Sequence, residues 1–274
     1  MHDTPLTHAP LGHTVVYPTQ YDASQLFPVD RNLNRAALSL TRAWHGADIW
    51  HAYELSWLNA KGKPQIAVGR FTFAHNSPFL VESKSLKLYL NSLNETRFDT
   101  LEHVRSTIER DLSNVSGSTV KVELWHPSKA ESFSIQALTG VCVDDLDIEI
   151  HHYEPAPDLL RCAAGNEQIS EVLVSHLLKS NCPVTGQPDW GSVQISYTGK
   201  AIDHASVLRY IVSLRRHTEF HEHCVEKMFC DLIQACQPEH LTVMACYTRR
   251  GGLDINPWRS TETAAPDLPR TLRQ

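Results

Sequence analysis

The sequence predicts an α+β protein made of two tandem units, each an antiparallel sheet with two helices on one face. Three observations support this: an internal repeat, the same order of strands and helices in both halves, and one amphipathic helix in each half. The repeat has a spacing of 120 to 122 residues. Its matched segments are YLNSL (89–93) and YIVSL (210–214), then Phe98 and Phe220, then Asp111 and Asp231.

Predicted strands occupy equivalent places in the two halves. The runs 48–58 and 65–74 flank the turn sequence NAKGKP and predict a hairpin, as do 169–178 and 191–199 in the second half. Further β-rich runs follow the repeated segments, at TVKVELWHP (119–127) and LTVMACYTR (241–249). Each half is therefore expected to hold two strands, two helices and at least one more strand.

The second helix of each half carries a single apolar stripe at the i, i+3/i+4, i+7 spacing that covers one face of a sheet. The stripe residues are Leu101, Val104, Ile108 and Leu112 in the first half, and Val225, Phe229 and Leu232 in the second. The polar, acidic stretch 127–167 is expected to join the halves.

Composition narrows the function classes. The chain has 274 residues, a net charge of -6 and a pI near 6.2. This charge provides no positive field for phosphate backbones or anionic lipid, so we expect no direct nucleic-acid partner and no membrane partner. The N-terminal sequence lacks the pattern of a signal peptide, and no apolar run approaches the roughly 18 residues that span a bilayer. A cytoplasmic location is expected.

The cysteines favour reduced thiols over disulfides or a zinc site, because there are seven of them at irregular spacing. Three fall on the predicted helix after residue 220 and are expected to be core filler. Two others lie in strand-like runs, where a small apolar residue is expected inside. Only two lie in turn-rich surroundings. The helix cysteines are Cys224, Cys230 and Cys236, the strand cysteines are Cys142 and Cys246, and the turn cysteines are Cys162 and Cys182.

The segment KSNCPVTGQPDWG (179–191) places Cys182 before a proline and a tight turn. Pro183 favours an extended backbone at Cys182, and the following turn residues bring Asp189 back towards the sulfur. A cysteine at the mouth of a loop is a suitable place for a nucleophilic thiolate. The residues alone leave two readings open, a reactive thiol and an idle loop cysteine.

Three more segments are candidates for binding. In TEFHEHC (218–224), a helix N-terminus presents polar side chains, or Thr218 simply caps the helix; the H-E-H spacing does not match a zinc helix. VESKSLKLY (81–89) places Glu82 before a helix rich in serine and lysine, which suits a ligand with donors and a phosphate, or is an ordinary capped helix start. TRRGGLDINPWRS (248–260) places arginine beside glycine, a weak phosphate signal.

Taken together, these segments resemble the NADPH-dependent 7-cyano-7-deazaguanine reductases, the nitrile reductases of queuosine biosynthesis. The resemblance also includes YPTQYDASQLFPV (17–29) and spans nearly the whole chain. It is to the long form of the family and implies two tandem tunnelling-fold modules, 1–140 with ESKSLKLY and 141–274 with the catalytic Cys and Asp. It further implies a homodimer.

The resemblance assigns roles to individual residues. It implies that Cys182 is the nucleophile, Asp189 the proton donor, and His221 a third catalytic residue beside the reacting carbon. The substrate 7-cyano-7-deazaguanine would contact Val81, Glu82, Ser83, Phe220, His221 and Glu222. NADPH, used twice per turnover, would contact Ser83, Lys84, Arg250 and Gly251, and no metal is implied.

The implied reaction is a four-electron reduction of the nitrile to an aminomethyl group through a covalent cysteine thioimide. A thiolate adds to the C≡N bond and divides a difficult reduction into easier steps. Asp189 would need a pKa raised by burial to deliver a proton near neutral pH. Two alternatives remain at this point: a zinc-dependent cyclohydrolase or pterin synthase of the same fold, and a non-catalytic purine-binding module with a structural Cys182.

Overall fold

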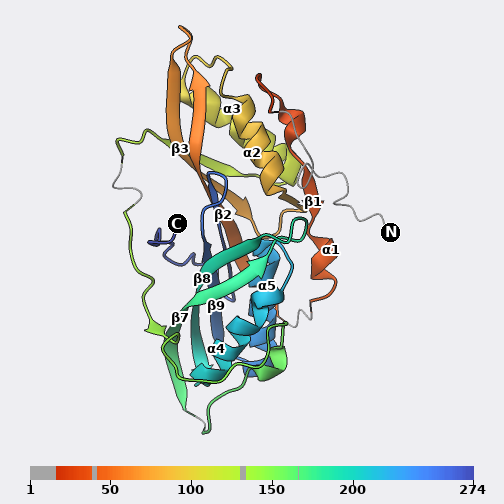
Figure 1. Cartoon of the computed structure of the whole chain (residues 1–274), viewed down its shortest axis with the longest axis vertical. Coiled ribbons are helices and arrows are strands. Elements are labelled where there is room, and N and C mark those ends of the chain that lie inside the picture. Colours follow the sequence, from red (N-terminus) through yellow and green to blue (C-terminus); the bar gives the residue numbers. More distant parts are fainter. Residues whose placement is uncertain (1–16, 39–41, 130–133, 166) are drawn as a thin grey trace. The chain divides into compact units, whose positions relative to one another are not determined.

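The computed structural model describes residues 17–38, 42–129, 134–165 and 167–274 (Figure 1). It has the predicted α+β character, with strands and helices interleaved along the chain. The chain divides into two compact units. The first comprises Met1–Leu33, Ile49–Phe133 and Arg249–Asp254; the second comprises Asn34–Asp48, Ser134–Thr248 and Ile255–Gln274.

The first unit contains the first predicted hairpin and helix pair. Its strand order is β5-β3-β2, joined by the first residues of β10, and β1 pairs with β4 in a separate two-stranded sheet. β3 and β5 are antiparallel, in register from Val68↔Trp125 to Thr72↔Lys121. The elements are η2 (Ala23–Gln25), β1 (Pro28–Asp30), β2 (His45–Leu58, of which the residues up to Asp48 belong to the second unit), β3 (Pro64–Ala74), β4 (Phe79–Val81), α2 (Ser83–Ser92), α3 (Leu101–Ser116) and β5 (Lys121–Trp125).

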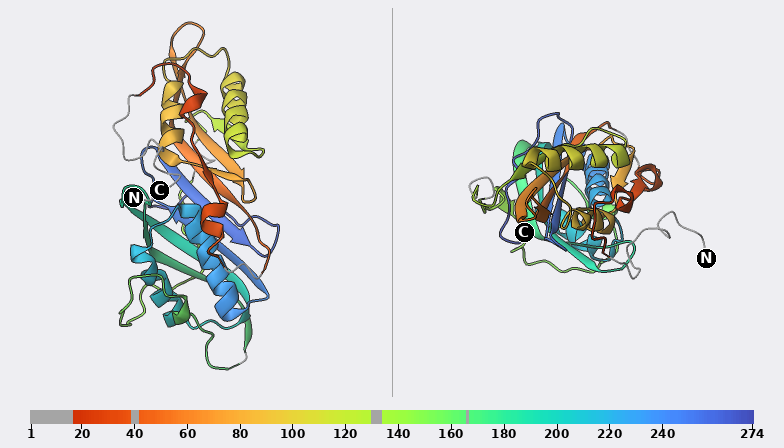
Figure 2. Two further views of the ribbon diagram at one scale, coloured as in Figure 1. Left: turned by 90° about the vertical axis from the view of Figure 1, so that its right-hand side faces the viewer. Right: turned by 90° about the horizontal axis from the view of Figure 1, so that it is seen from above.

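The second unit repeats this order of elements. β7 and β8 form a long antiparallel hairpin with a bulge between Ser175 and Leu178, and β8 pairs with β9. Helix α5 runs along these strands (Figure 2). The elements are α1 (Asn32–Arg35, of which Asn34 and Arg35 belong to this unit), β6 (Val141–Cys142), η4 (Pro157–Leu159), β7 (Gln168–Asn181), β8 (Pro188–Lys200), α4 (His204–Ser213), η5 (Leu214–Arg216), α5 (His221–Cys236), β9 (His240–Tyr247) and β10 (Leu253–Ser260).

A large apolar core lies between this sheet and its helices. The inward residues of β7, β8 and β9 pack against the stripes of α4 and α5, and most are almost completely buried. Central members are Leu178, Val193, Val243, Val225 and Phe229. Burial of an aliphatic or phenyl side chain contributes about 1.5–3 kcal/mol, so this core is a main source of the unit's stability.

The sequence repeat corresponds to equivalent hydrogen bonds within each unit. In the first, Glu82 caps α2, and the Tyr89 hydroxyl donates to Asp111 on α3 over 2.7 Å. In the second, Asp203 caps α4, and the Tyr210 hydroxyl donates to Asp231 on α5 over 2.5 Å. The repeated Tyr and Asp residues therefore join the two helices of each unit by a hydrogen bond between buried side chains.

One expectation needs correction. Cys142 is exposed rather than buried, because the run VCVDDLDIEI forms only the two-residue strand β6 and then continues without regular structure. The segment after Gly252 forms a full strand, β10, although Pro257 and two preceding glycines disfavour that assignment. No helix among the described residues is long and apolar enough to cross a membrane.

Candidate active site

Cys182 lies in the turn of the β7–β8 hairpin. Its backbone N-H donates to Gln187 O over 2.9 Å, and Gly186 N donates to Cys182 O over 3.0 Å. Gly186 has φ +67°, a conformation that favours glycine. Cys182 is 3% exposed. Both hydrogen bonds that close the turn use the backbone of the cysteine, which leaves the thiol out of them.

The corresponding turn of the first unit is one residue shorter and is closed by a similar pair of backbone bonds around Asn59. Asn59 N donates to Lys63 O over 2.9 Å, and Gly62 N donates to Asn59 O over 2.8 Å. Here the Asn59 side chain also accepts from Lys61 N and Lys63 N. Asn59 and Cys182 therefore occupy matching places in the two hairpins.

Asp189 lies close to Cys182 because the hairpin folds back on itself. Asp189 pairs with Ser180 across the ladder, and side chains two residues apart on a strand share a face. Cys182 lies just beyond the end of β7, two residues after Ser180, and its N-H bonds to Gln187 O on the other side of the turn. Asp189 is 6% exposed. The predicted nucleophile and proton donor therefore lie at the same end of one hairpin.

His221 lies beside Asp189, with Nε2 of the imidazole 3.7 Å from Oδ1 of the carboxylate. The segment before α5 runs along the end of β7: Asn181 N donates to His217 O, and Glu219 N donates to Asn181 O. These bonds place the first turn of α5 next to the Cys182 turn. His221 also lies edge-on to Tyr247 on β9, with ring centroids 4.1 Å apart.

The start of α5 supplies the other predicted residues of this unit. Phe220 is the N-cap and makes no side-chain cap bond, and Glu222 is buried in the first turn. A carboxylate at a helix N-terminus is favoured by the helix dipole. Asn34 Nδ2 lies 2.7 Å from His223 Nδ1, a contact that joins α1 to the first turn of α5. Thr218, the alternative cap, does not cap the helix.

The three helix cysteines behave as the sequence predicts. Burial raises the pKa of Cys224 to about 11 and the pKa of Cys230 and Cys236 to about 12. A thiol with such a pKa stays protonated at neutral pH and is a poor nucleophile.

Glu82 in the first unit is fully buried and caps α2. Its carboxylate accepts from Lys84 N and Ser85 N, both over 2.7 Å. Burial raises the pKa of Glu82, although these hydrogen bonds act in the opposite direction. Each carboxylate oxygen can accept more than one bond, so the cap leaves acceptor capacity for a ligand's N-H groups. Val81 ends β4 just before it, and Ser83 begins the helix.

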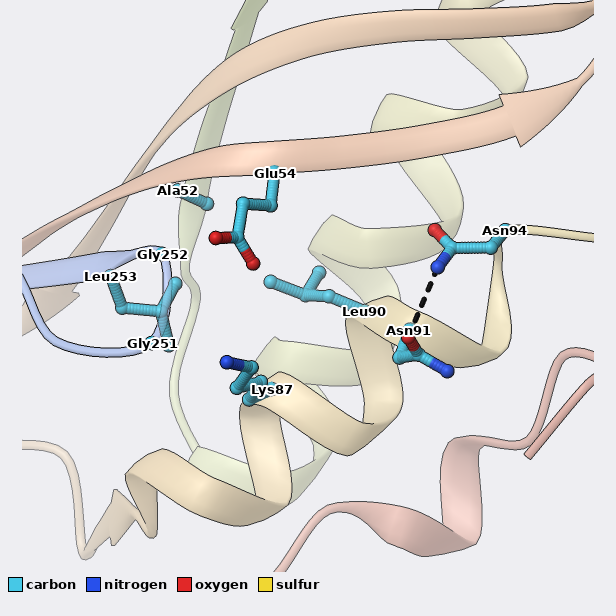
Figure 3. A pocket seen from close by; sticks show the side chains of 9 residues that line it. All are labelled: Ala52, Glu54, Lys87, Leu90, Asn91, Asn94, Gly251, Gly252 and Leu253. Atoms are coloured by element: carbon cyan, nitrogen blue, oxygen red, sulfur yellow. Dashed lines mark hydrogen bonds between the residues drawn. The ribbon is translucent and has the colours of Figure 1, made fainter. Parts of the chain in front are cut away.

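Gly251 lines a small pocket of the first unit, next to the helix that carries Lys84. The pocket is lined by Ala52, Glu54, Lys87, Leu90, Asn91, Asn94, Gly251, Gly252 and Leu253 (Figure 3). Lys84 Nζ donates to the Tyr17 hydroxyl over 3.0 Å and lowers the pKa of that phenol. Gly251 has φ +62°, and a Cβ there would come within 2.9 Å of Lys87 Nζ.

The residues around the Cys182 turn and those around Glu82 and Gly251 include side chains that the sequence predicted for the site. Each group also includes neighbours that the sequence did not assign to it. Tyr247 and Glu54 were expected only as parts of strands. Lys87 belongs to the lysine-rich helix start that the sequence offered for a phosphate, although it was not among the residues assigned to NADPH. Within the described ranges, no group of three or more His, Cys, Asp and Glu side chains is arranged to hold a metal ion.

Comparison with known proteins gives two family matches. Residues 17–124 match the family described as nitrile reductase, 7-cyano-7-deazaguanine-reductase N-term, and residues 188–266 match the QueF-like protein family. A protein of Bordetella avium (strain 197N), called NADPH-dependent 7-cyano-7-deazaguanine reductase, is 57% identical over 98% of both chains. The chain belongs to this reductase family.

Other members of the 7-cyano-7-deazaguanine reductase family are similarly close. Proteins of the same name from Bordetella bronchiseptica (strain ATCC BAA-588 / NCTC 13252 / RB50) and Burkholderia lata (strain ATCC 17760 / DSM 23089 / LMG 22485 / NCIMB 9086 / R18194 / 383) are 55% and 54% identical. They cover 98% and 97% of this chain, and 99% and 98% of their own lengths are matched. A crystal structure of the archaeosine synthase QueF-Like in the apo form matches 37% of this chain and 99% of its own, at 15% identity and a TM-score of 0.31.

Proposed function

We propose that this protein catalyses the NADPH-dependent reduction of the nitrile of 7-cyano-7-deazaguanine to an aminomethyl group, in queuosine biosynthesis. The observation that carries the proposal is the placement of Cys182, Asp189 and His221 around the β7–β8 hairpin turn. The full-length similarity to proteins named for this activity supports it. The zinc-dependent alternative has no support from the described residues, and no observation favours a non-catalytic purine-binding module.

The first chemical step is addition of the Cys182 thiol across the C≡N bond. The sulfur forms a bond to the nitrile carbon, one π bond of the nitrile breaks, and the nitrogen takes up a proton, which leaves a C=N-H thioimide. The backbone bonds of the turn hold Cys182 in place, so a nitrile bound beside the sulfur would need little rearrangement for this step.

Asp189 delivers the proton to the nitrile nitrogen in this proposal. A buried carboxyl group holds a proton more readily than an exposed one, and a proton shared with the thiol avoids two adjacent negative charges. His221, 3.7 Å from this carboxylate, can relay protons or stabilise the nitrogen as its charge changes. It is the third catalytic residue of the proposal.

Glu82 and Glu222 bind the N-H edge of the deazaguanine, and Val81, Ser83, Phe220 and His221 complete the substrate contacts. A guanine-like edge presents N-H donors, for which carboxylate oxygens are matching acceptors. Both acids lie at a helix start within their own unit. The specificity of the site would then depend on two buried carboxylates rather than on apolar shape.

Ser83, Lys84, Arg250 and Gly251 would hold NADPH, which supplies the two hydrides of the four-electron reduction when bound. The fit rests on the first unit's own features: cationic side chains on the first turns of α2, and Gly251, which has φ +62° and lies against the Lys87 ammonium. Lys84 offers a point charge for such a group.

We further propose that the chain is built from two tunnelling-fold modules, 1–140 and 141–274, and acts as a cytoplasmic homodimer without metal or direct nucleic-acid contact. The matching Tyr–Asp hydrogen bonds and helix caps of the two units support a duplicated module. The proposed modules divide the sequence at residue 140. The compact units differ from this division, because residues 34–48 belong to the second unit and residues 249–254 to the first.

The test is covalent capture. Incubation of the protein with 7-cyano-7-deazaguanine in the absence of NADPH should raise its intact mass by one substrate molecule, with the label on the Cys182 peptide. Cys182→Asn is the control, since Asn59 occupies the matching turn. Addition of NADPH should convert the substrate to the primary amine. An unchanged wild-type mass, or a labelled Cys182→Asn variant, would falsify the mechanism.

A further inference from the structure

The segment Arg270–Gln274 folds back onto the second unit. Thr271 and Gln274 are buried, at 5% and 8% exposure, whereas Leu272 between them is 83% exposed. The segment forms a turn in which Gln274 N donates to Thr271 O over 3.2 Å and Thr271 N donates to Gln274 Oε1 over 3.0 Å. The turn directs the Gln274 side chain inward.

The Gln274 amide contacts the strand that supports His221. Its Nε2 donates to Tyr247 O over 3.1 Å and to Asn256 Oδ1 over 2.5 Å. Tyr247 ends β9, and its ring lies edge-on to the imidazole of His221 at 4.1 Å. The amide therefore fixes the backbone of the residue against which His221 rests.

Arg273 contacts the strand that carries Asp189. Its Nη1 donates to Gly191 O over 3.3 Å and to His176 O over 2.7 Å. Gly191 follows Asp189 by two residues on β8 and pairs with Tyr247 on β9. Arg273 and Gln274 thus bind β8 and β9 at the paired residues Gly191 and Tyr247. Gly191 is two residues from Asp189 on β8, and Tyr247 contacts His221.

We propose that Gln274 and Arg273 are positioning residues that set the separation of Asp189 and His221, acting through Tyr247 and Gly191. The proposal rests on the proposed function, in which Asp189 and His221 handle the proton. Proton transfer needs heavy atoms within about 2.6–3.2 Å, so the 3.7 Å pair must close slightly during the reaction. A misplacement of about 1 Å can cost on the order of 100-fold in rate.

The experiment compares Gln274→Leu, Arg273→Ala and Arg273→Lys with the matched control Leu272→Ala. The first readout is the rate of adduct formation at Cys182 together with the substrate Kd. We expect Gln274→Leu and Arg273→Ala to slow the adduct by about 10- to 100-fold, with Kd within about threefold and a shifted pH profile. Arg273→Lys, which keeps a cationic N-H donor group, should recover part of the rate, and Leu272→Ala should match wild type.

The second readout does not need the reaction. The ring protons of His221, assigned by comparison with His221→Gln, are titrated by NMR in the free protein. A shifted midpoint in Gln274→Leu or Arg273→Ala, and an unchanged one in Leu272→Ala, is expected. If wild type forms no adduct, the proposed function fails while this titration still decides the positioning role.

Unchanged adduct rates and an unchanged His221 midpoint in both variants would overturn the proposal. So would a rate loss that tracks the unfolded fraction in thermal melts with an unaltered pH profile, since that is a purely structural effect. If Gln274→Leu does not fold, the Arg273→Ala and Arg273→Lys pair gives the same comparison.

Discussion

His221 Nε2 lies 3.7 Å from Asp189 Oδ1, and the two side chains come from elements separated by the whole of helix α4. The approach depends on Asn181, whose backbone bonds to residues 217 and 219 bring the start of α5 to the hairpin turn. The proposed proton transfer therefore depends on how the hairpin turn and the start of α5 are held together.

Asp189→Asn should separate binding from turnover. The amide fills the same space but cannot deliver a proton, so we expect the substrate Kd to stay within about threefold while kcat falls by about 10²–10⁴-fold. Calorimetric binding and steady-state kinetics provide the two values. A kcat near that of wild type would mean that the proton comes from elsewhere.

Glu82→Gln should weaken both folding and substrate binding, whereas Asp203→Asn should weaken folding alone. Glu82→Gln removes one of the two carboxylate oxygens that accept from Lys84 N and Ser85 N, at a cost of about 1–2 kcal/mol. Asp203→Asn keeps the Oδ1 that accepts from Ala205 N and Ser206 N, and it loses the oxygen that pairs with Arg161. Of the two residues Glu82 and Asp203, only Glu82 is proposed to contact the substrate. Urea unfolding and substrate titration of both variants make the comparison, and equal substrate affinity in the two would remove Glu82 from the binding site.

Lys84→Ala should reduce the preference for NADPH over NADH. The lysine is proposed to meet a phosphate that only NADPH carries, so Kd for NADPH should rise about tenfold, an expected loss of one charge-assisted contact. Kd for NADH should change little. Lys121→Ala is the matched control, because its ammonium pairs with Glu123 on β5, away from α2. An unchanged ratio in Lys84→Ala would contradict the assignment.

Acid should weaken the second unit through Glu226. Burial alone would raise the pKa of this carboxyl, but Arg259 and Arg35 outweigh burial and lower the pKa to about 2. Because the folded-state pKa lies below the usual 4.5, the stabilisation is complete above about pH 5 and is lost as pH falls towards 2. The difference between the usual pKa of 4.5 and the folded-state pKa of about 2 corresponds to roughly 3 kcal/mol in the free energy of unfolding.

Glu226→Gln tests this prediction. The variant should be less stable than wild type at pH 7, because Arg35 and Arg259 lose the carboxylate that each contacts at 2.6 Å. The gap in unfolding free energy, measured with urea, should narrow between pH 5 and pH 3. A gap that stays constant over this range would show that Glu226 is not the titrating group.

Much of this fold could be predicted from the sequence because its signals were local. The hairpins, the amphipathic helices and the Tyr and Asp positions of the repeat all follow from period and spacing, and each has its counterpart in the structure. Strand β10 was missed because Pro257 and the preceding glycines outweigh its apolar residues in any local count. Cys142 was misplaced because an alternating run needs a partner strand to become buried, and β6 pairs over two residues only.

The candidate site was predictable where its residues lie close in sequence. Cys182 and Asp189 share one turn, which local turn chemistry indicates. Tyr247 and Gln274 could not be found in this way, because their contacts with His221 and with each other depend on the pairing of β8 with β9 and on the return of the chain's last described residues. The roles of the site residues remain predictions.

The matching turns at Asn59 and Cys182 suggest a division of labour between two copies of one ancestral hairpin. In the Asn59 turn the side chain also accepts two backbone N-H groups, whereas in the other turn Thr185 accepts one and Cys182 contributes only its backbone. A duplicated hairpin can in this way carry a structural side chain in one copy and the proposed nucleophile in the other. Under the proposed mechanism the two turns of one chain would then hold one reactive thiol between them.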